Sequence, residues 1–150
     1  MSARFLKKYL SDEDLKTIAA TIADVERTTN GQIRVSIRQR RHWRERKLTL
    51  HELAVQEFHR LGMQNTKHRT GVMILLLMSE RKFHIVADRG IHEKVKDGTW
   101  ESVAGEMAHH FKAGNFCEGI CSGIREAGKI LAAYFPKDGE SELSNDVVVS

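Results

Sequence analysis

Long apolar stretches are missing from this sequence, and their absence excludes several classes of protein. The longest uninterrupted apolar run has seven residues, from Val72 to Met78, whereas a membrane-spanning helix needs about 20. The first ten residues contain no apolar run of the kind that forms the centre of a secretory signal peptide. We therefore expect no membrane span and take the cytoplasm as the default location.

Proline and cysteine are also scarce. Pro136 is the only proline in the chain, so nothing before it indicates a proline-rich linker. With 150 residues, the sequence predicts one domain over residues 1–136, followed by an acidic and mobile tail over residues 137–150. Cys117 and Cys121 lie four positions apart and share one face of a helix, which is poor geometry for a disulfide. We interpret both as small buried core residues.

The common catalytic motifs are absent as well. The sequence has no nucleophile elbow of the form Gly-x-Ser-x-Gly, no phosphate-binding P-loop and no dinucleotide-binding fingerprint. No serine, histidine and aspartate show a recognisable triad arrangement. Eight histidines are present, but none has the His-x3-His spacing of a helical zinc site and there is no Cys-x2-Cys partner. Motifs alone therefore indicate neither a hydrolase triad nor a zinc site.

The apolar run itself is the clearest structural signal. Gly71 precedes it and the polar segment Ser79–Lys82 follows it, so residues 72–78 are typical of a strand buried on both faces. Residues 83–88 then alternate weakly between apolar and polar side chains. The short connection predicts an antiparallel hairpin.

The elements before this hairpin predict a parallel crossover. Ser11 and Asp14 form a capping box that begins an amphipathic helix. Residues 32–39 alternate as in a strand with one buried face. A second capping box, Thr49 with Glu52, begins a helix that ends at Gly62. Strand, helix and strand in this order predict parallel strands with a right-handed connection.

Two more helices follow the hairpin. Asp97 or Thr99 is the expected cap of the first, and Asn115 with Glu118 marks the start of the second. Glycines inside the last helix, at positions 119 and 123, indicate close packing against a neighbour, because each costs about 1 kcal/mol relative to alanine. The predicted fold is a three-layer α/β/α sandwich: a small mixed sheet of three to four strands flanked by four or more helices.

This topology predicts a site at one edge of the sheet. Parallel strands start at the same edge and the hairpin returns to it, so three loops should converge there: residues 28–32, 69–71 and 88–90. Asp97 can join them from the next helix. The candidate ligand-binding residues are Gly31, Gln32, Arg69, Thr70, Gly71 and Gly90. The glycines allow tight turns and close approach of the backbone to a ligand; the alternative is that these are ordinary turn residues with satisfied hydrogen bonds.

Several motifs resemble a known family in order and spacing. They are Thr28–Val35 after the first helix, Phe58–Gly62 as Phe-x-x-Leu-Gly, Thr70–Met73 before the central strand, Ala87–Lys94 after the hairpin, and Phe111–Phe116 with Glu118–Ile120 as Phe-x-x-Gly-x-Phe-x-x-Gly-Ile. Together they are similar to the TPM domain family, which includes a thylakoid-lumen acid phosphatase and a photosystem II repair protein. The resemblance implies an α/β sandwich and, in some members, calcium binding or phosphatase activity.

The departures from the family pattern fall at the predicted site. Gln32 stands where the family favours glutamate, and Arg69 with Thr70 replaces an Asn/Asp-Asn pair. Calcium prefers several oxygen ligands, and only Asp88 and Asp97 remain as strong candidates. The resemblance thus implies weak Ca²⁺ binding or none, with Asp88, Asp97 and Arg89 as the catalytic residues if the protein is a phosphatase, and Arg69 or Arg89 orienting a phosphate-bearing ligand.

A strongly basic segment supports a different hypothesis. Residues 38–47 carry six lysines and arginines in ten positions. Such a segment can bind an anionic partner or nucleic acid through Arg40, Arg41 and Arg44, with Trp43 stacking on a base; the alternative is an ordinary solvated loop. This second hypothesis is a non-catalytic interaction module. The sequence assigns no oligomeric state.

Overall fold

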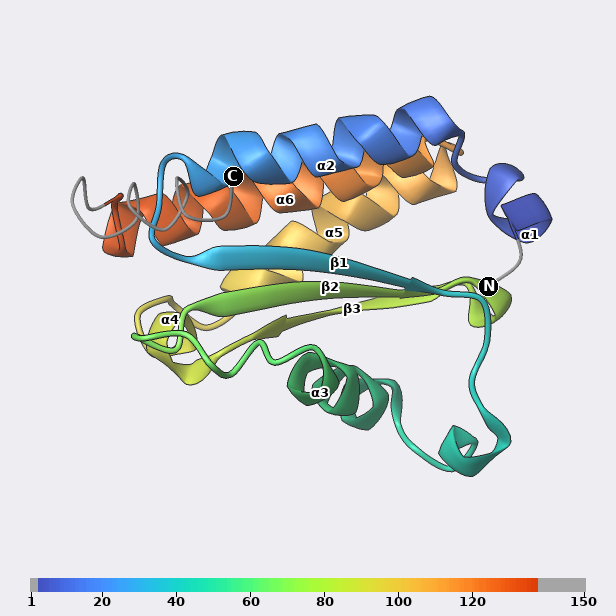
Figure 1. Ribbon diagram of the computed structural model, residues 1–150, viewed down its shortest axis with the longest axis horizontal. Coiled ribbons are helices and arrows are strands. Elements are labelled where there is room, and N and C mark those ends of the chain that lie inside the picture. The colour runs from blue at the N-terminus through green and yellow to red at the C-terminus, as the bar shows by residue number, and fades with distance from the viewer. Residues whose placement is uncertain (1–2, 138–150) are drawn as a thin grey trace.

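Three strands form one mixed sheet, ordered β1 (Gln32–Arg38), β2 (Gly71–Leu77) and β3 (Lys82–Ala87), with β2 in the centre (Figure 1). This computed structural model describes residues 3–137. The predicted acidic tail, apart from Lys137, lies outside the described residues.

The strand register confirms both predicted connections. β1 is parallel to β2, with Gln32 opposite Gly71, and β3 is antiparallel to β2, with Ala87 opposite Val72. The hairpin connection differs in detail from a plain turn. It is a short 3-10 helix, η2 (Met78–Glu80), followed by Arg81 in the left-handed conformation with φ of 53°.

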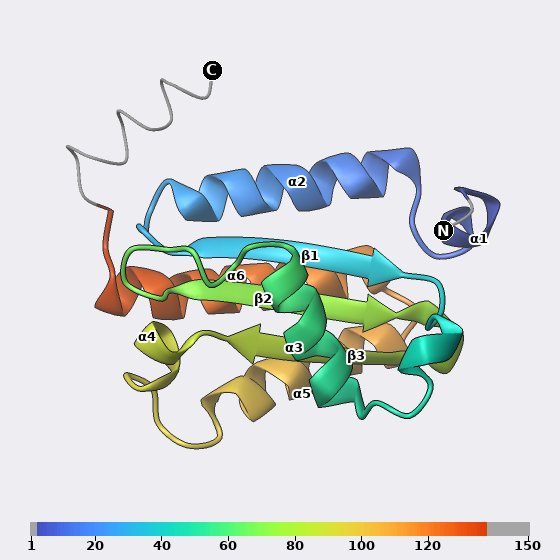
Figure 2. The ribbon, with the colours of Figure 1, turned by 60° about the horizontal axis from the view of Figure 1, so that its bottom comes forward.

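Helices cover both faces of the sheet, as the sequence predicts. The helices α2, α5 and α6 lie on one face, and α3 lies on the other (Figures 1 and 2). The helices are α1 (Ala3–Lys7), α2 (Asp12–Glu26), α3 (Leu50–Arg60), α4 (Arg89–His92), α5 (Thr99–Lys112) and α6 (Phe116–Tyr134), with a short 3-10 helix, η1 (Trp43–Glu45), between β1 and α3. Within residues 3–137, none of the helices has the length and apolar character needed to cross a membrane.

The alternation of side chains along β2 divides the hydrophobic core in two. Val72, Ile74 and Leu76 belong to the cluster beneath α2, α5 and α6, whereas Met73 and Leu75 pack with the residues of α3. Every residue of β2 is buried. This explains why β2 is apolar throughout while its neighbours alternate.

Side-chain hydrogen bonds cap the starts of α2, α3 and α4 but not those of α5 and α6. At α2 the Asp14 N–H donates to the Ser11 hydroxyl at 3.0 Å, and the Ser11 N–H donates back to the Asp14 carboxylate at 2.9 Å. The same reciprocal pair joins Thr49 and Glu52 at α3. The predicted cap of α5 is wrong: Gly98, with φ of 88°, precedes the helix and no side chain caps it. Gly98 adopts this left-handed conformation without a steric penalty, so the chain turns into the helix by backbone geometry alone.

The interior glycines of α6 confirm the expected close packing. A Cβ atom at Gly119 would lie 2.5 Å from the Phe111 ring, and one at Gly123 would lie 2.4 Å from the Met107 sulfur. Both neighbours belong to α5. The glycines therefore let α5 and α6 approach more closely than any side chain would permit.

The start of the edge strand β1 is covered by polar side chains. The Ile33 N–H donates to the Glu26 carboxylate at 2.8 Å, and the Arg34 guanidinium donates both to Glu26 at 2.8 Å and to the Ile33 carbonyl at 2.6 Å. The outward-facing backbone of Ile33 thus has hydrogen-bond partners, although no strand of residues 3–137 pairs with it on that side.

Candidate functional site

The three predicted loops do meet at the edge of the sheet. Gln32 and Gly71 are register partners where β1 and β2 begin, and the Asp88 N–H donates to the Gly71 carbonyl at 2.8 Å where β3 ends. The edge is therefore built by the parallel crossover and the hairpin together.

Asp88 and Arg69 form the central contact of this edge. The Arg69 guanidinium donates to both carboxylate oxygens of Asp88, at 2.7 and 3.0 Å. One of those oxygens also accepts the Arg89 N–H at 2.8 Å, which caps α4. The Asp88 side chain is only 6% exposed. The hydrogen bonds to Asp88 raise the pKa of the Arg69 guanidinium, so the guanidinium keeps its charge.

These contacts decide how well the edge suits a calcium ion. Both oxygens of Asp88 already accept hydrogen bonds from cationic or backbone donors, and the guanidinium lies where a bound cation would neutralise the carboxylate. Asp97 is exposed in the turn before α5, and it makes no hydrogen bond or ion pair with Asp88. No three His, Cys, Asp or Glu side chains of that part of the chain gather as a metal site. The donor set in this arrangement does not fit a calcium ion at Asp88.

The glycines of the edge allow the chain to approach itself. A Cβ atom at Gly90 would lie 1.9 Å from the His68 carbonyl oxygen, and one at Gly71 would lie 2.8 Å from the Met63 carbonyl oxygen. A Cβ atom at Gly31 would lie 2.7 Å from the Leu131 side chain. Internal packing accounts for all three glycines.

The remaining candidates divide into buried and exposed groups. Thr70 is buried, and its N–H donates to the Thr66 hydroxyl at 2.9 Å. Gln32 and Arg89 are exposed. Arg89 is thus a cation of the edge that a ligand from solvent can reach.

A segment that the sequence did not indicate also reaches this edge. After α6 the chain passes beside the α2–β1 loop, where Thr29 and Pro136 form an isolated antiparallel bridge. The Phe135 carbonyl accepts the Thr29 hydroxyl at 2.5 Å and the Asn30 N–H at 3.0 Å. The His68 ring stacks on Phe135, with centroids 6.2 Å apart. No local pattern predicts the hydrogen bond between Thr29 and Phe135, because the two residues lie 106 positions apart.

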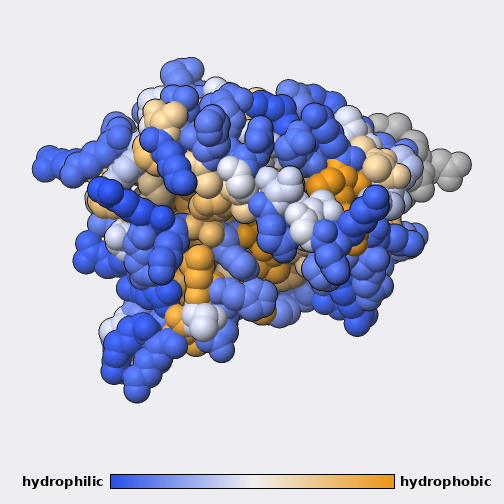
Figure 3. All heavy atoms as spheres, turned by 180° about the vertical axis from the view of Figure 1, so that it is seen from behind, coloured by the Kyte–Doolittle hydropathy of each residue, from blue (hydrophilic) through white to orange (hydrophobic). Residues whose placement is uncertain are grey.

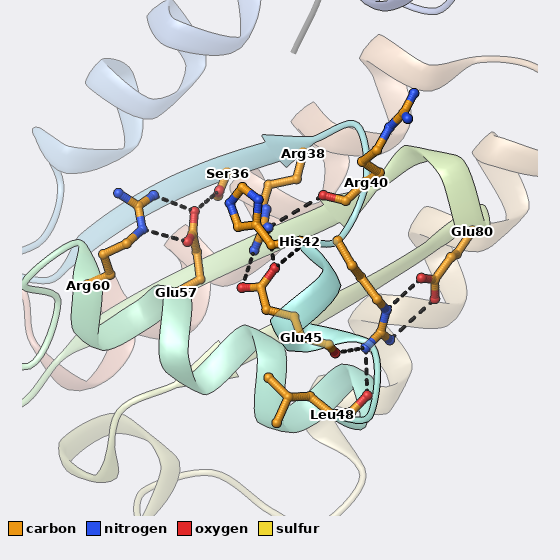
Figure 4. Close-up of polar contacts among 10 residues, drawn as sticks. Ser36, Arg38, Arg40, His42, Glu45, Leu48, Glu57, Arg60 and Glu80 are labelled. Carbon is orange, nitrogen blue, oxygen red and sulfur yellow. Dashed lines mark hydrogen bonds and ion pairs between the residues drawn. The ribbon is translucent and has the colours of Figure 1, made fainter.

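A second polar cluster lies beside the second half of β1, at Ser36 and Arg38 (Figure 4). It lines a cleft of about 420 Å³ between β1, η1 and α3. Glu57 accepts the Ser36 hydroxyl at 2.6 Å and two donors of Arg60 at 2.8 and 2.9 Å. The hydrogen bonds from Arg60, followed by the one from Ser36, lower the pKa of Glu57 despite its burial. The cluster therefore carries matched ion pairs.

Glu45 and Arg38 form the other half of this cluster. The Arg38 guanidinium donates to the two Glu45 oxygens at 2.6 and 3.1 Å, and the His42 N–H adds a third donor at 2.8 Å. These hydrogen bonds, led by those from Arg38, lower the pKa of Glu45. The pair ties η1 to the end of β1.

The basic segment contains both anchoring and exposed arginines. Arg41 donates to Glu80 at 2.6 and 3.3 Å and to the carbonyls of Glu45 and Leu48 at 3.0 and 2.6 Å, and its side chain is only 14% exposed. Arg40 instead points away from the cluster (Figure 4). Of the three arginines predicted to bind an anion, Arg41 therefore holds the loop in place, whereas Arg40 and Arg44 are exposed.

The exposed part of the segment projects from the body of the protein. We call Arg40, Trp43, Arg44, Arg46 and Lys47 the cationic tip; all five are exposed. Trp43 is 70% exposed, and the guanidiniums of Arg44 and Arg46 each lie 5.5 Å from its ring centroid. Viewed from behind, the loop forms a hydrophilic projection at the lower left (Figure 3).

Comparison with known proteins assigns the fold to a family. The model of the TPM domain matches residues 6–130, which is most of the chain. This protein belongs to the TPM domain family. The match confirms the resemblance in the sequence motifs. No protein with curated annotation shows significant similarity to this TPM domain.

Solved structures with the same fold come from several bacteria. BA42 from the psychrophilic bacterium Bizionia argentinensis is 35% identical, with a TM-score of 0.79 over 88% of each chain. The N-terminal domain of a protein from P. gingivalis is 18% identical, with a TM-score of 0.67 over 85% of this chain and 79% of that one. The N-terminal domain of cg2496 from Corynebacterium glutamicum is 15% identical, with a TM-score of 0.62 over 88% and 78%. The last two support the fold alone.

Proposed function

We propose that this TPM domain is a non-catalytic module that binds phosphate-bearing polyanions, such as single-stranded nucleic acid, through the cationic tip. The exposed Trp43 ring, with Arg44 and Arg46 beside it, is the observation that carries the proposal. Guanidiniums attract phosphates, and an exposed indole offers a stacking surface to a base.

The anchoring of the loop supports the proposal. Arg41 fixes the loop to η2 through Glu80, and Arg38 fixes it to β1 through Glu45. A loop that is already ordered loses less conformational entropy when it binds a partner. The tip is thus presented by a rigid base.

The contrast with the loop edge also supports it. There the charges of Asp88 and Arg69 neutralise each other, so the Asp88 carboxylate is not free for acid–base chemistry or for a metal. At the cationic tip the positive charges face solvent. Attraction of an anion is the interaction that the described charges favour most.

A salt series with a labelled single-stranded oligonucleotide tests the proposal. We expect log K to fall linearly with log salt, by about 0.7 for each phosphate that a basic residue neutralises. The triple variant Arg40→Ala/Arg44→Ala/Arg46→Ala should flatten this slope. Trp43→Ala should weaken binding by about 1–3 kcal/mol if one base stacks on it.

The matched control removes three charges elsewhere. Lys16, Lys94 and Lys129 are exposed and lie outside the tip, so the triple Lys→Ala variant changes the net charge equally but should keep most of the slope. If both triple variants flatten the salt dependence equally, binding depends on overall charge and not on the cationic tip. If wild type does not bind the oligonucleotide at low salt, the proposal is wrong.

A second candidate is a phosphate-bearing ligand at the loop edge, because Arg89 and Gln32 are exposed there. Family membership supports testing it together with calcium. We expect wild type to show little change in melting temperature in about 10 mM calcium, well above the ~0.1–1 mM range of weak calcium modules, and to hydrolyse a generic aryl phosphate slowly if at all. Any rise in melting temperature caused by calcium should disappear in Asp88→Asn and in Asp97→Asn. Any rise in melting temperature caused by inorganic phosphate should disappear in Arg89→Ala.

A further inference from the structure

Two histidines face each other across the interface between α3 and β3. His51 lies in the first turn of α3, and His84 lies in the middle of β3, opposite Leu75 on β2. The Nδ1 atom of His51 and the Nε2 atom of His84 are 2.9 Å apart. Their rings are nearly perpendicular, at 82°, with centroids 5.1 Å apart.

The contact constrains the protons of the pair. A hydrogen bond between two ring nitrogens needs one N–H donor and one nitrogen with a free lone pair, so at least one of the rings is neutral. When both rings are neutral and carry their protons on the outer nitrogens, Nε2 of His51 and Nδ1 of His84, both inner nitrogens have free lone pairs. That tautomer presents two imidazole ligands to one point.

We propose that His51 and His84 bind a single transition-metal ion of the zinc class between their inner nitrogens, with water filling the other positions. Nitrogens about 2.0–2.1 Å from a tetrahedral zinc ion are about 3.3 Å apart, so the pair needs to open by only about 0.4 Å. His51 is exposed and can move by this amount.

The site differs in ligand class from the loop edge. Imidazole nitrogens favour zinc, copper and nickel, whereas calcium and magnesium favour oxygen. The two sites also belong to different elements, because the histidine pair connects α3 to β3 and the edge is made of the loops at the strand starts. The proposal therefore does not depend on any calcium or phosphate binding there.

Competing ligands within residues 3–137 are less suited to the same ion. His109 and His110 are sequence neighbours on α5, and their ring centroids are 6.0 Å apart. Burial raises the pKa of the Cys117 thiol to about 12, and a protonated thiol is a poor metal ligand. His51 and His84 are the pair whose nitrogens already converge.

Metal binding at this pair should connect α3 to the sheet. An ion that binds the folded protein and not the unfolded chain raises the melting temperature in proportion to the logarithm of its free concentration. We expect zinc to do this near pH 7.5, with one ion per chain, and magnesium to have no such effect. Because protons compete with the metal for the same nitrogens, the effect should weaken as the pH is lowered.

The test compares zinc titrations of wild type with those of His51→Ala, His84→Gln and the control His109→Ala. We expect zinc affinity, measured by calorimetry, to fall at least tenfold in each of the first two variants and to stay unchanged in the control. His51 is exposed, so His51→Ala keeps the test valid if His84→Gln does not fold. Substoichiometric Cu²⁺ should broaden the amide signals around residues 51 and 84 first in an NMR spectrum.

The opposite results would overturn the proposal. Unchanged zinc affinity in His51→Ala, or broadening centred on α6 near Cys117, would place the metal elsewhere. No zinc binding by wild type at up to about 1 mM would show that the contact is a hydrogen bond and nothing more.

Discussion

Arg69 forms an ion pair with Asp88 at the end of β3, so a positive charge of the protein itself already balances this carboxylate. It adopts a left-handed backbone conformation, with φ of 57°, which is uncommon for a residue other than glycine. The bidentate pair with Asp88 holds it there. The sequence placed both residues at the same edge but did not reveal that they bind each other, because that depends on the path of the loop before β2.

The variant Arg69→Asn tests whether this guanidinium occupies the place of a cation. It frees the Asp88 oxygens and adds an amide oxygen, so calcium should raise the melting temperature of the variant more than that of wild type. In the double variant Arg69→Asn/Asp88→Asn, calcium should no longer cause this larger rise in melting temperature. Thermal melts with and without calcium measure the difference, and an unresponsive single variant contradicts the interpretation.

Gly90 and Gly105 form a matched pair of glycines in helices. A methyl group at Gly90 would collide with the carbonyl oxygens of His68 and Arg69, at 1.9 and 2.5 Å, whereas one at Gly105 meets no atom within 4 Å. We expect Gly105→Ala to stabilise the protein by about 0.5–1 kcal/mol. Gly90→Ala should destabilise it severely, because backbone atoms cannot move aside as side chains do. Chemical denaturation of both variants gives the comparison, and similar values for the two would refute it.

Single elements were predictable wherever a local pattern was complete. The apolar run of β2 and the capping boxes of α2 and α3 contain the information for their own formation within a few residues. The start of α5 was predicted to within one residue, but its capping residue was wrong because a glycine conformation replaces the side-chain cap there. The ion pair between Arg41 and Glu80 joins residues 39 positions apart, and no local pattern contains it.

Leu75 tests the central position of β2. Its side chain is fully buried against α3, so Leu75→Ala should cost about 2–5 kcal/mol through lost burial and a residual cavity. Leu61, which is 42% exposed, provides the control, and Leu61→Ala should cost clearly less. Equilibrium unfolding in urea measures both, and a loss below about 1 kcal/mol at Leu75 would be incompatible with a central strand.

Glu57 makes the attachment of α3 to β1 dependent on pH. Hydrogen bonds from Arg60 and Ser36 lower its pKa in the folded protein, so its stabilising contribution is complete above its ordinary pKa and is lost as the pH falls toward the lower folded value. Glu57→Gln should therefore be less stable than wild type by about 1–2 kcal/mol near pH 7. The difference in stability between the two proteins should narrow as the pH falls below the ordinary pKa of a glutamate. Unfolding curves at neutral and acidic pH check it, and a difference that does not change with pH would show that the charge is irrelevant.

On the scale of the whole molecule, the sheet is covered unequally. Three helices lie over one face and α3 over the other, and the sequence predicted these layers from the order of the elements. It also predicted which loops converge, since topology determines that. It could not predict which polar groups pair at the edge, or that His51 meets His84, because these contacts depend on side-chain conformations across separate elements.

The polar cover over the start of β1 has a consequence for how copies of the protein behave in concentrated solution. An exposed strand edge is a template on which another chain can add a strand, and this is a common route to aggregation. The Ile33 N–H donates to Glu26 and the Ile33 carbonyl accepts from Arg34, so neither group is free to pair with another strand. Both side chains also place charge beside the edge. Glu26→Ala should therefore shorten the lag before light scattering rises during mild heating, whereas Glu13→Ala, at the exposed start of α2, should not.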